Sequence, residues 1–452
     1  MSGLFGTDGI RGEAGVPPLD PRTIHRVGRA LARTLASAKT PRILIGRDTR
    51  SSGGAIESWL AGGIAAVGGE AVSAGVISTP AVAHLTRQFG FSAGIAISAS
   101  HNPFPDNGVK IFSDRGSKAS EELEQAISEE ATVDGPDHPG LGYHNISLPP
   151  PDPTLQEEYI GYLKSTLPAA TRSLLSQARL RVALDCANGA TYQMGPLLLR
   201  GLGIDVLASG VSPDGRNINE KCGSTHPEAV ARRVMESDCD FGAALDGDGD
   251  RLLLVDRQGQ LVNGDAILLL CARHMKSEHR LPAAGMVVTV MSNLALERAL
   301  EIEGITLYRT QVGDKYVAEE MERRGLTLGG EQSGHIILSE YSPTGDGLLT
   351  LLQVLRALVA GRKPLHELAY LKAFPQVLVN VPVREKRDVR EVPEIVRAME
   401  EAERRMAGRG RMLVRFSGTE PLLRIMLEGP DEGEIRALSA SIAEATRRSL
   451  AE

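Results

Sequence analysis

The sequence predicts an α/β fold of three similar α/β domains around a central cleft, followed by a smaller α+β domain. Three observations support this prediction. Strand-like apolar runs alternate with helix-period patterns, the alternation recurs as a longer repeat, and the pattern changes near residue 370. A chain of 452 residues is long enough for several hydrophobic cores. The predicted domains are residues 1–150, 151–254, 255–370 and 371–452.

Each of the three predicted α/β units opens and closes on an apolar strand. A helix and a second strand follow the opening strand, and another helix leads into the closing strand. The opening strands are residues 42–48, 181–186 and 286–291, and the closing strands are residues 93–99, 241–245 and 326–329.

An unusual polar loop follows each closing strand. The three loops read Ser-His-Asn-Pro, Asp-Gly-Asp-Gly-Asp-Arg and Gly-Glu-Gln-Ser-Gly-His. Open α/β sheets bind ligands at the carboxyl ends of their strands. We therefore expect the three loops to meet at one cleft.

Two further features mark the ends of the repeat. The proline-rich run 149–153 is excluded from a helix or an inner strand and predicts a linker. Beyond residue 370 we expect a strand over 376–383, a helix over 392–406, two strands around 415–426 and a helix over 432–450.

Composition argues against nucleic-acid and membrane partners. The formal net charge is −7, aromatic residues make up 4% of the chain, and no apolar run approaches 18 residues. The four cysteines form no Cys-x-x-Cys pair, so a zinc or redox site is not expected. Without a signal-like N-terminus, the sequence predicts a cytoplasmic enzyme.

Asp246, Asp248 and Asp250 alternate with glycines directly after an apolar strand. Three carboxylates so close together repel one another unless a cation neutralises them, and hard oxygen ligands suit Mg²⁺ or Ca²⁺. An EF-hand is excluded because its glycine and terminal glutamate positions are Arg251 and Arg257. A solvated acidic turn explains the pattern less well, since it needs no alternating glycines.

Ser100 and His101 follow the first closing strand, and Asn107-Gly108 predicts a turn that brings Lys110 back beside them. A hydroxyl beside an imidazole and an ammonium suits a nucleophile or a phosphate carrier. Taken alone, the segment is better explained as an ordinary Ser/Asn/Pro-rich turn with an incidental histidine, and the other motifs of the chain favour the phosphate-carrying function. A Gly-x-Ser-x-Gly match at residues 90–94 lacks the strand-turn-helix context of serine hydrolases. The chain has no Gly-Lys pair, so a Walker-type phosphate loop is excluded.

Two later segments have the chemistry of ligand contacts. Residues 330–335 offer donors and acceptors for sugar hydroxyls, and residues 415–424 combine guanidinium groups, hydroxyls and amides that suit a phosphate dianion. Locally, a surface turn with salt bridges explains the second segment as well. The candidate residues are Glu331, Ser333 and His335 in the first segment and Arg415, Ser417, Gly418, Thr419 and Arg424 in the second.

Together these segments resemble the α-D-phosphohexomutase superfamily over the whole chain. The motifs that carry the resemblance are residues 5–12, 98–103, 246–251, 331–335 and 415–421. The resemblance is strongest to the amino-sugar branch, on residues 217–227, 313–317 and Gln332, where other branches usually carry Met. Lys315 departs from many relatives, which have Arg there, so the charge is kept but a bidentate contact is lost.

This resemblance implies an isomerase that interconverts glucosamine 6-phosphate and glucosamine 1-phosphate through a 1,6-bisphosphate, for UDP-N-acetylglucosamine and cell-wall precursor synthesis. It implies phosphoserine at Ser100 and one Mg²⁺ held by Asp246, Asp248, Asp250 and a Ser100 phosphate oxygen. It further implies catalytic roles for Arg11, His101, Lys110 and Arg251, sugar contacts from Glu331, Ser333 and His335, and a phosphate clamp of Arg415, Ser417, Gly418, Thr419 and Arg424.

Other functions remain open from the sequence. They are a phosphomannomutase/phosphoglucomutase, a phosphatase or hydrolase that uses Ser100, and a non-catalytic Ca²⁺ or sugar-phosphate binding protein. The expected partner is a small sugar phosphate, and a homodimer is left open.

Overall fold

The computed structural model describes residues 4–6, 8–36, 40–132, 150–384, 387–417 and 421–451. They divide into two compact units. The first unit comprises Met1–Met291 and Ile305–Tyr370, and the second comprises Ser292–Gly304 and Leu371–Glu452. Thr7 of the N-terminal motif and Pro149 of the predicted linker lie outside the described residues.

Three sheets of the first unit share one topology. In each, the first strand runs parallel to the second and to the third, and a fourth strand returns antiparallel to the third. The predicted repeat is therefore present. The strands, in the order first, second, third and return, are β2 (Arg42–Arg47), β3 (Glu70–Val76), β4 (Ala93–Ile97) and β5 (Asp106–Ser113); β6 (Arg181–Asp185), β7 (Asp205–Ser209), β8 (Phe241–Leu245) and β9 (Leu252–Asp256); and β11 (Gly285–Thr289), β12 (Thr306–Thr310), β13 (Leu328–Gly330) and β14 (Ile336–Leu338).

Two extra strands extend the first and second sheets. β1 (Ile10–Glu13) pairs antiparallel with β5, and β10 (Leu261–Val262) pairs antiparallel with β9. The pairing of β1 brings the N-terminal motif to the strand that carries Lys110.

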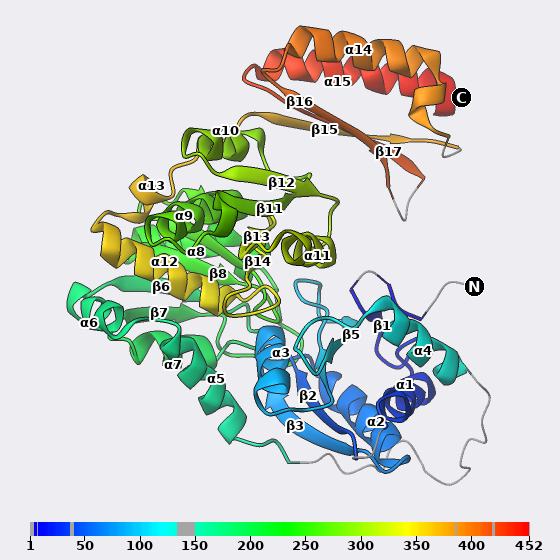
Figure 1. The fold of residues 1–452 in the computed structure, drawn as a ribbon, viewed down its shortest axis with the longest axis vertical. Helices are drawn as coiled ribbons and strands as arrows, with labels where there is room; N and C mark the ends of the chain where they lie inside the picture. The colour runs from blue at the N-terminus through cyan, green and yellow to red at the C-terminus, as the bar shows by residue number, and fades with distance from the viewer. Residues whose placement is uncertain are drawn as a thin grey trace. The chain divides into compact units, whose positions relative to one another are not determined.

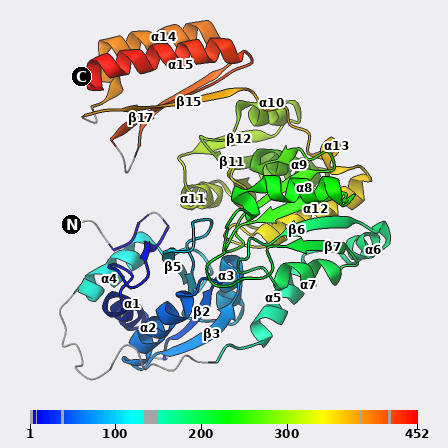
Figure 2. The same cartoon turned by 180° about the vertical axis from the view of Figure 1, so that it is seen from behind.

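Helices cover the sheets of the first unit, and β2 lies between α3 on one side and α2 on the other (Figures 1 and 2). Because helices cover both faces, the inner strands are nearly continuous apolar runs, and every residue of β4 and of β8 is buried. The helices are α1 (Pro21–Thr34), α2 (Gly53–Ala65), α3 (Thr79–Gln88), α4 (Glu121–Thr132), α5 (Thr154–Ser165), α6 (Ala169–Ala178), α7 (Met194–Arg200), α8 (Pro227–Glu236), α9 (Gly264–Ser277), α11 (Asp314–Arg324), α12 (Gly347–Gly361) and α13 (Leu365–Leu368).

Asn107 and Gly108 form part of β5 and not the predicted turn. Gly108 pairs with Arg11 of β1, and the chain reverses earlier, within residues 98–105. A Cβ at Gly108 would lie 2.4 Å from the carbonyl oxygen of Ser98. The glycine thus permits a close backbone approach inside a sheet, and the turn predicted from the Asn-Gly pair was wrong.

Residues 371–452 of the second unit form the smaller α+β element expected after residue 370, and residues 292–304, with α10, also belong to this unit. Its antiparallel sheet has the order β15-β17-β16, and α14 and α15 lie side by side on one face of it (Figure 1). The final helix ends earlier than predicted and is followed by a π-helical turn at Arg447–Ala451. The elements are α10 (Leu294–Ile302), β15 (Gln376–Pro382), α14 (Pro393–Met406), β16 (Arg411–Phe416), β17 (Leu422–Glu428) and α15 (Glu432–Thr446).

Among the described residues, no helix is both long enough and apolar enough to cross a membrane.

Candidate active site

The loops that follow β4, β8 and β13 meet in the first unit. Ser100 Oγ of the first loop donates a hydrogen bond to Asp246 Oδ2 of the second, across 2.6 Å. His335 Nε2 of the third loop lies 3.8 Å from Asp250 Oδ2. The equivalent ends of three similar sheets therefore supply side chains to one place.

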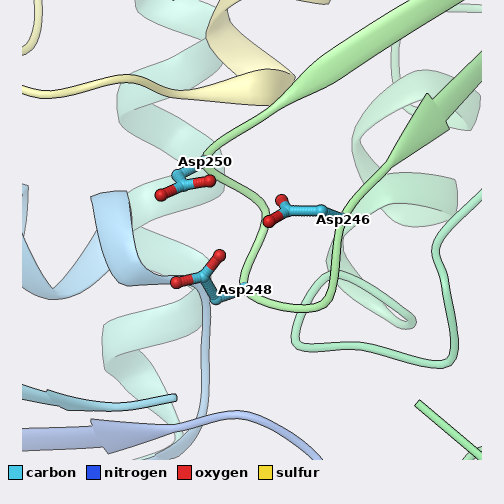
Figure 3. A group of neighbouring side chains, drawn as sticks. All are labelled: Asp246, Asp248 and Asp250. Carbon is cyan, nitrogen blue, oxygen red and sulfur yellow. The ribbon is translucent and has the colours of Figure 1, made fainter. Parts of the chain in front are cut away.

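Asp246, Asp248 and Asp250 form a buried acidic cluster. One carboxylate oxygen from each lies within 4.8 Å of the others, and the three carboxylates face a common space (Figure 3). Oδ1 of Asp248 and Oδ1 of Asp250 are buried and accept no hydrogen bond from the described residues. Burial, and then repulsion from Asp250 and Asp248, raises the pKa of Asp246. Oxygen ligands that repel one another and retain free lone pairs fit a hard divalent cation.

The backbone of this loop needs its glycines. Gly249 has a φ of +76°, which L side chains rarely adopt, and a Cβ there would lie 2.5 Å from the side chain of Thr191. The backbone N–H of Arg251 closes the loop by donating to Asp246 Oδ1 at 3.1 Å. This sharp turn aims three successive aspartates inward.

Lys110 on β5 is a cation that contacts the acidic cluster. Its Nζ lies 3.0 Å from Asp248 Oδ2, 3.6 Å from Asp250 Oδ2 and 3.4 Å from Asp8 Oδ2. Burial alone would lower the pKa of Lys110, but the three carboxylates outweigh it and raise the pKa. The same ammonium, together with the Thr79 hydroxyl, holds the pKa of Asp248 low despite its burial. Lys110 therefore stays charged.

Ser100 has a left-handed backbone conformation, with a φ of +53°, and its side chain is buried. Its Oγ lies 3.3 Å from His101 Nδ1. Burial, and then the nearby Arg251 guanidinium, lowers the pKa of His101 to about 4. The imidazole is thus neutral near pH 7.

Arg11 and Arg251 approach the same loops from two sides. Arg11 Nη1 donates to the carbonyl oxygen of Ser98 at 3.3 Å, and its guanidinium pairs with Asp8. Arg251 Nε lies 3.9 Å from Asp250 Oδ1. Burial opposes the charge of Arg251, but the surrounding carboxylates raise its pKa. Both guanidinium groups lie close enough to His101, the neighbour of Ser100, to lower its pKa.

The predicted sugar-contact residues lie on the loop between β13 and β14. Glu331 Oε1 accepts from the backbone N–H of Gly313 at 3.3 Å, and Ser333 Oγ donates to Glu331 Oε2 at 3.5 Å. His335 is 3% exposed, and neither ring nitrogen forms a hydrogen bond within the described residues. His335 Nε2 faces two carboxylates, at 3.5 Å from Asp314 Oδ2 and 3.8 Å from Asp250 Oδ2, and Ser333 is exposed.

Sequence reasoning missed an ionic bridge beside this site. Lys118 Nζ lies 2.7 Å from Asp8 Oδ1 and 2.6 Å from Asp314 Oδ2. Lys118, Asp314 and Lys315 line a cavity of about 860 Å³. Asp8 and Asp314 fall inside motifs that were noted, but no pattern around Lys118 distinguishes it from a surface lysine.

The predicted phosphate clamp falls in the second unit. Arg415 of β16 stands directly opposite Arg424 of β17 in the strand register. Burial, and then repulsion from Arg424, lowers the pKa of Arg415. Two cations placed opposite each other are unfavourable unless an anion binds between them. Ser417, which follows β16, is buried, whereas Gly418 and Thr419 lie outside the described residues.

Comparison with known protein families shows the family to which the chain belongs. Four domain models of the phosphoglucomutase/phosphomannomutase family match it in order: domain I at residues 2–135, domain II at 157–259, domain III at 263–374 and the C-terminal domain at 378–445. The chain belongs to this family and is an isomerase of the phosphohexomutase class.

Curated relatives of similar length are phosphoglucosamine mutases. The phosphoglucosamine mutase of Solibacter usitatus is 48% identical over 99% of both chains. That of Geobacillus thermodenitrificans is 46% identical over 100% of this chain and 99% of its own.

The solved structures share the fold. A phosphoglucomutase/phosphomannomutase family protein from Burkholderia thailandensis aligns with a TM-score of 0.78 and 23% identity, over 98% of this chain and 97% of its own. The Aspergillus fumigatus N-acetylphosphoglucosamine mutase, solved with GlcNAc-6P and magnesium, aligns with a TM-score of 0.64 and 20% identity, over 98% and 95% of the two chains.

Proposed function

We propose that this chain is a phosphoglucosamine mutase that interconverts glucosamine 6-phosphate and glucosamine 1-phosphate. The observation that carries the proposal is the placement of Ser100 Oγ 2.6 Å from Asp246, within the acidic cluster. The full-length relatives named phosphoglucosamine mutase support the choice of amino sugar.

The reaction proceeds through phosphoserine at Ser100. The Ser100 phosphoryl group passes to O1 of glucosamine 6-phosphate, so that the serine O–P bond breaks and a new O–P bond forms. The resulting glucosamine 1,6-bisphosphate reverses its orientation within the site and returns its 6-phosphoryl group to Ser100. Glucosamine 1-phosphate leaves and the phosphoserine is restored. This product would feed UDP-N-acetylglucosamine synthesis for cell-wall precursors.

Asp246, Asp248 and Asp250, with a phosphate oxygen on Ser100, would hold one Mg²⁺. The unsatisfied oxygens of Asp248 and Asp250 support this assignment, as does the magnesium in the solved Aspergillus enzyme. When bound, the ion supplies charge neutralisation for phosphoryl transfer.

The remaining groups of the site position the phosphates and move protons. Lys110, Arg11 and Arg251 offset the charge of the transferring phosphoryl group. Arg11, His101 and Lys110 are the proposed groups for phosphate contact and proton transfer, and the 3.3 Å distance between His101 Nδ1 and Ser100 Oγ supports this.

Glu331, Ser333 and His335 would bind the sugar hydroxyls in either orientation of the intermediate. Arg415, Ser417 and Arg424, with Gly418 and Thr419, would hold whichever phosphate is not reacting. Such anchoring fixes the reacting phosphate by proximity and orientation. The four predicted domain boundaries and the cytoplasmic location also stay predictions, and a homodimer stays open.

Parallel assays of the purified enzyme test the substrate. With Mg²⁺ and a catalytic amount of sugar 1,6-bisphosphate, turnover of glucosamine 6-phosphate should exceed turnover of glucose 1-phosphate and of mannose 1-phosphate. Slower turnover on the amino sugar than on both hexoses would make the protein a phosphoglucomutase/phosphomannomutase. Release of inorganic phosphate without isomerisation would indicate a phosphatase.

A further inference from the structure

The carbonyl groups of the Ser100 loop are held from two directions. Asn219 Nδ2 donates to the carbonyl oxygen of Ser100 at 2.9 Å and to that of Asn102 at 3.1 Å. Arg50 Nη2 donates to the same two oxygens, at 3.5 Å and 2.7 Å. Asn219 and Arg50 are both buried, so water has little access to replace these bonds.

These bonds hold a backbone conformation that serine does not favour. Ser100 has a φ of +53°, in the left-handed region where a Cβ is crowded. Such residues persist only where the surroundings over-determine them, and they often lie at active sites. The donors on the two carbonyls are the surroundings that supply this constraint.

Asn219 comes from the segment after β7, far from Ser100 in the sequence. It also has a left-handed backbone, with a φ of +60°, and its N–H donates to the carbonyl oxygen of Ala187 at 2.9 Å. A Cβ at Gly247 would lie 2.5 Å from the Ser100 carbonyl oxygen and 2.8 Å from Asn219 Nδ2. The amide of Asn219 therefore lies where the Ser100 loop contacts the loop of Asp246, Asp248 and Asp250.

We propose that Asn219 is a positioning residue that sets Ser100 Oγ against the acidic cluster for both phosphoryl transfers. Its side chain donates to the carbonyl oxygens of Ser100 and Asn102, so it acts through the backbone of the serine loop. The inference deepens the proposed function and rests on it. A residue in this role affects kcat more than KM, because it places the reacting atom and leaves the sugar contacts unchanged.

The test compares two asparagines that both have a left-handed backbone conformation. Asn219→Gly removes the amide and keeps a left-handed φ without strain. Asn188→Gly is the control for loosening of the segment that carries Asn219. Asn188 also has a left-handed backbone, with a φ of +49°, and within the described residues its side chain bonds to Ser212, Asn217 and Cys222 and not to the Ser100 loop. Asn219→Asp keeps the side-chain shape but turns an acceptor toward two carbonyl oxygens.

Steady-state kinetics on glucosamine 6-phosphate should show kcat lowered on the order of 10- to 100-fold in Asn219→Gly and further in Asn219→Asp. KM should stay within about 3-fold, and Asn188→Gly should keep nearly wild-type kcat. Equal kcat in Asn219→Gly and wild type, or equal losses in the two glycine variants, would overturn the proposal.

Crystal structures of both glycine variants separate this inference from the substrate assignment. Wild-type protein that turns over no hexose or hexosamine phosphate would refute the proposed function. The positioning role would then be tested by the backbone conformation of Ser100 in the variant structures. It predicts that Ser100 leaves the left-handed region in Asn219→Gly and keeps it in Asn188→Gly, whereas an unchanged Ser100 in both would overturn it.

Discussion

Ser100 Oγ donates a hydrogen bond to Asp246 Oδ2 across 2.6 Å, although 146 positions separate the two residues in the sequence. Each residue follows the third strand of its sheet, β4 for Ser100 and β8 for Asp246. Because the two sheets repeat one topology, Ser100 and the acidic cluster lie at corresponding strand ends, where side chains from different sheets can meet.

The acidic cluster is expected to depend on Asp248 for metal binding. Asp248→Asn removes one charge and leaves Lys110 facing fewer carboxylates. We therefore expect kcat to fall about 100-fold or more, and half-maximal activity to require a higher Mg²⁺ concentration than in wild type. Activity measured across a Mg²⁺ titration checks this. Asp256→Asn, at a buried aspartate outside the cluster, is the control. Wild-type activity of Asp248→Asn at limiting Mg²⁺ would refute the metal assignment.

The Lys118 bridge is expected to contribute to stability. Lys118→Met leaves Asp8 and Asp314 without their shared cation, at side-chain exposures of 33% and 18%, and should lower the free energy of unfolding by about 2 kcal/mol. Chemical denaturation measures the change.

Lys315→Met provides the comparison for Lys118. Lys315 pairs with Glu121, whose side chain is 80% exposed, so this variant should lose no more than about 1 kcal/mol. Equal losses in the two variants would mean that the bridge is an ordinary surface ion pair.

The fold and the central site were accessible from local patterns. Apolar runs ending in polar loops identified the closing strands, and β8 has the predicted bounds. The alternation of aspartate and glycine after β8 was sufficient to indicate the acidic cluster, because the chemistry of the cluster lies within five consecutive residues.

The supporting residues could not be predicted in this way. Arg50, Lys118 and Asn219 act through partners that are distant in sequence, such as Asn219 with Ser100, 119 positions apart. Such contacts depend on how separate sheets pack, which local periodicity does not encode. Gly108 illustrates the converse error, because an Asn-Gly pair that locally favours a turn was placed in a strand by its pairing with β1.

The opposed arginines are expected to bind phosphate at little cost in stability. Arg415→Ala removes a charge-assisted contact and should raise KM for the sugar phosphate at least about 10-fold. Because it also relieves repulsion from Arg424, the melting temperature should stay the same or rise. Arg397→Ala, an exposed arginine of α14, is the control for both measurements. An unchanged KM would remove Arg415 from the clamp.

His84 is expected to make the first unit sensitive to acid. Its ring stacks on Tyr162 at 3.6 Å between centroids, and burial lowers the pKa of His84 to about 4. The unfolded chain binds this proton with a pKa near 6.5, so stability present above pH 6.5 is lost as the pH falls through 4.

His84→Phe keeps a stacked ring that does not titrate. Relative to this variant, wild type should lose up to about 3 kcal/mol of unfolding free energy between pH 7 and pH 4. Urea unfolding at pH 7, 5.5 and 4 measures the difference. Parallel pH profiles of the two proteins would contradict the prediction.

Phosphate on Ser100 is the central claim of the proposed mechanism. Intact-mass analysis with phosphopeptide mapping, after incubation with sugar 1,6-bisphosphate and Mg²⁺, should find one phosphate on Ser100 and none on Ser100→Ala, which should also lose mutase activity. Phosphate on another residue, or wild-type turnover by Ser100→Ala, would contradict the account.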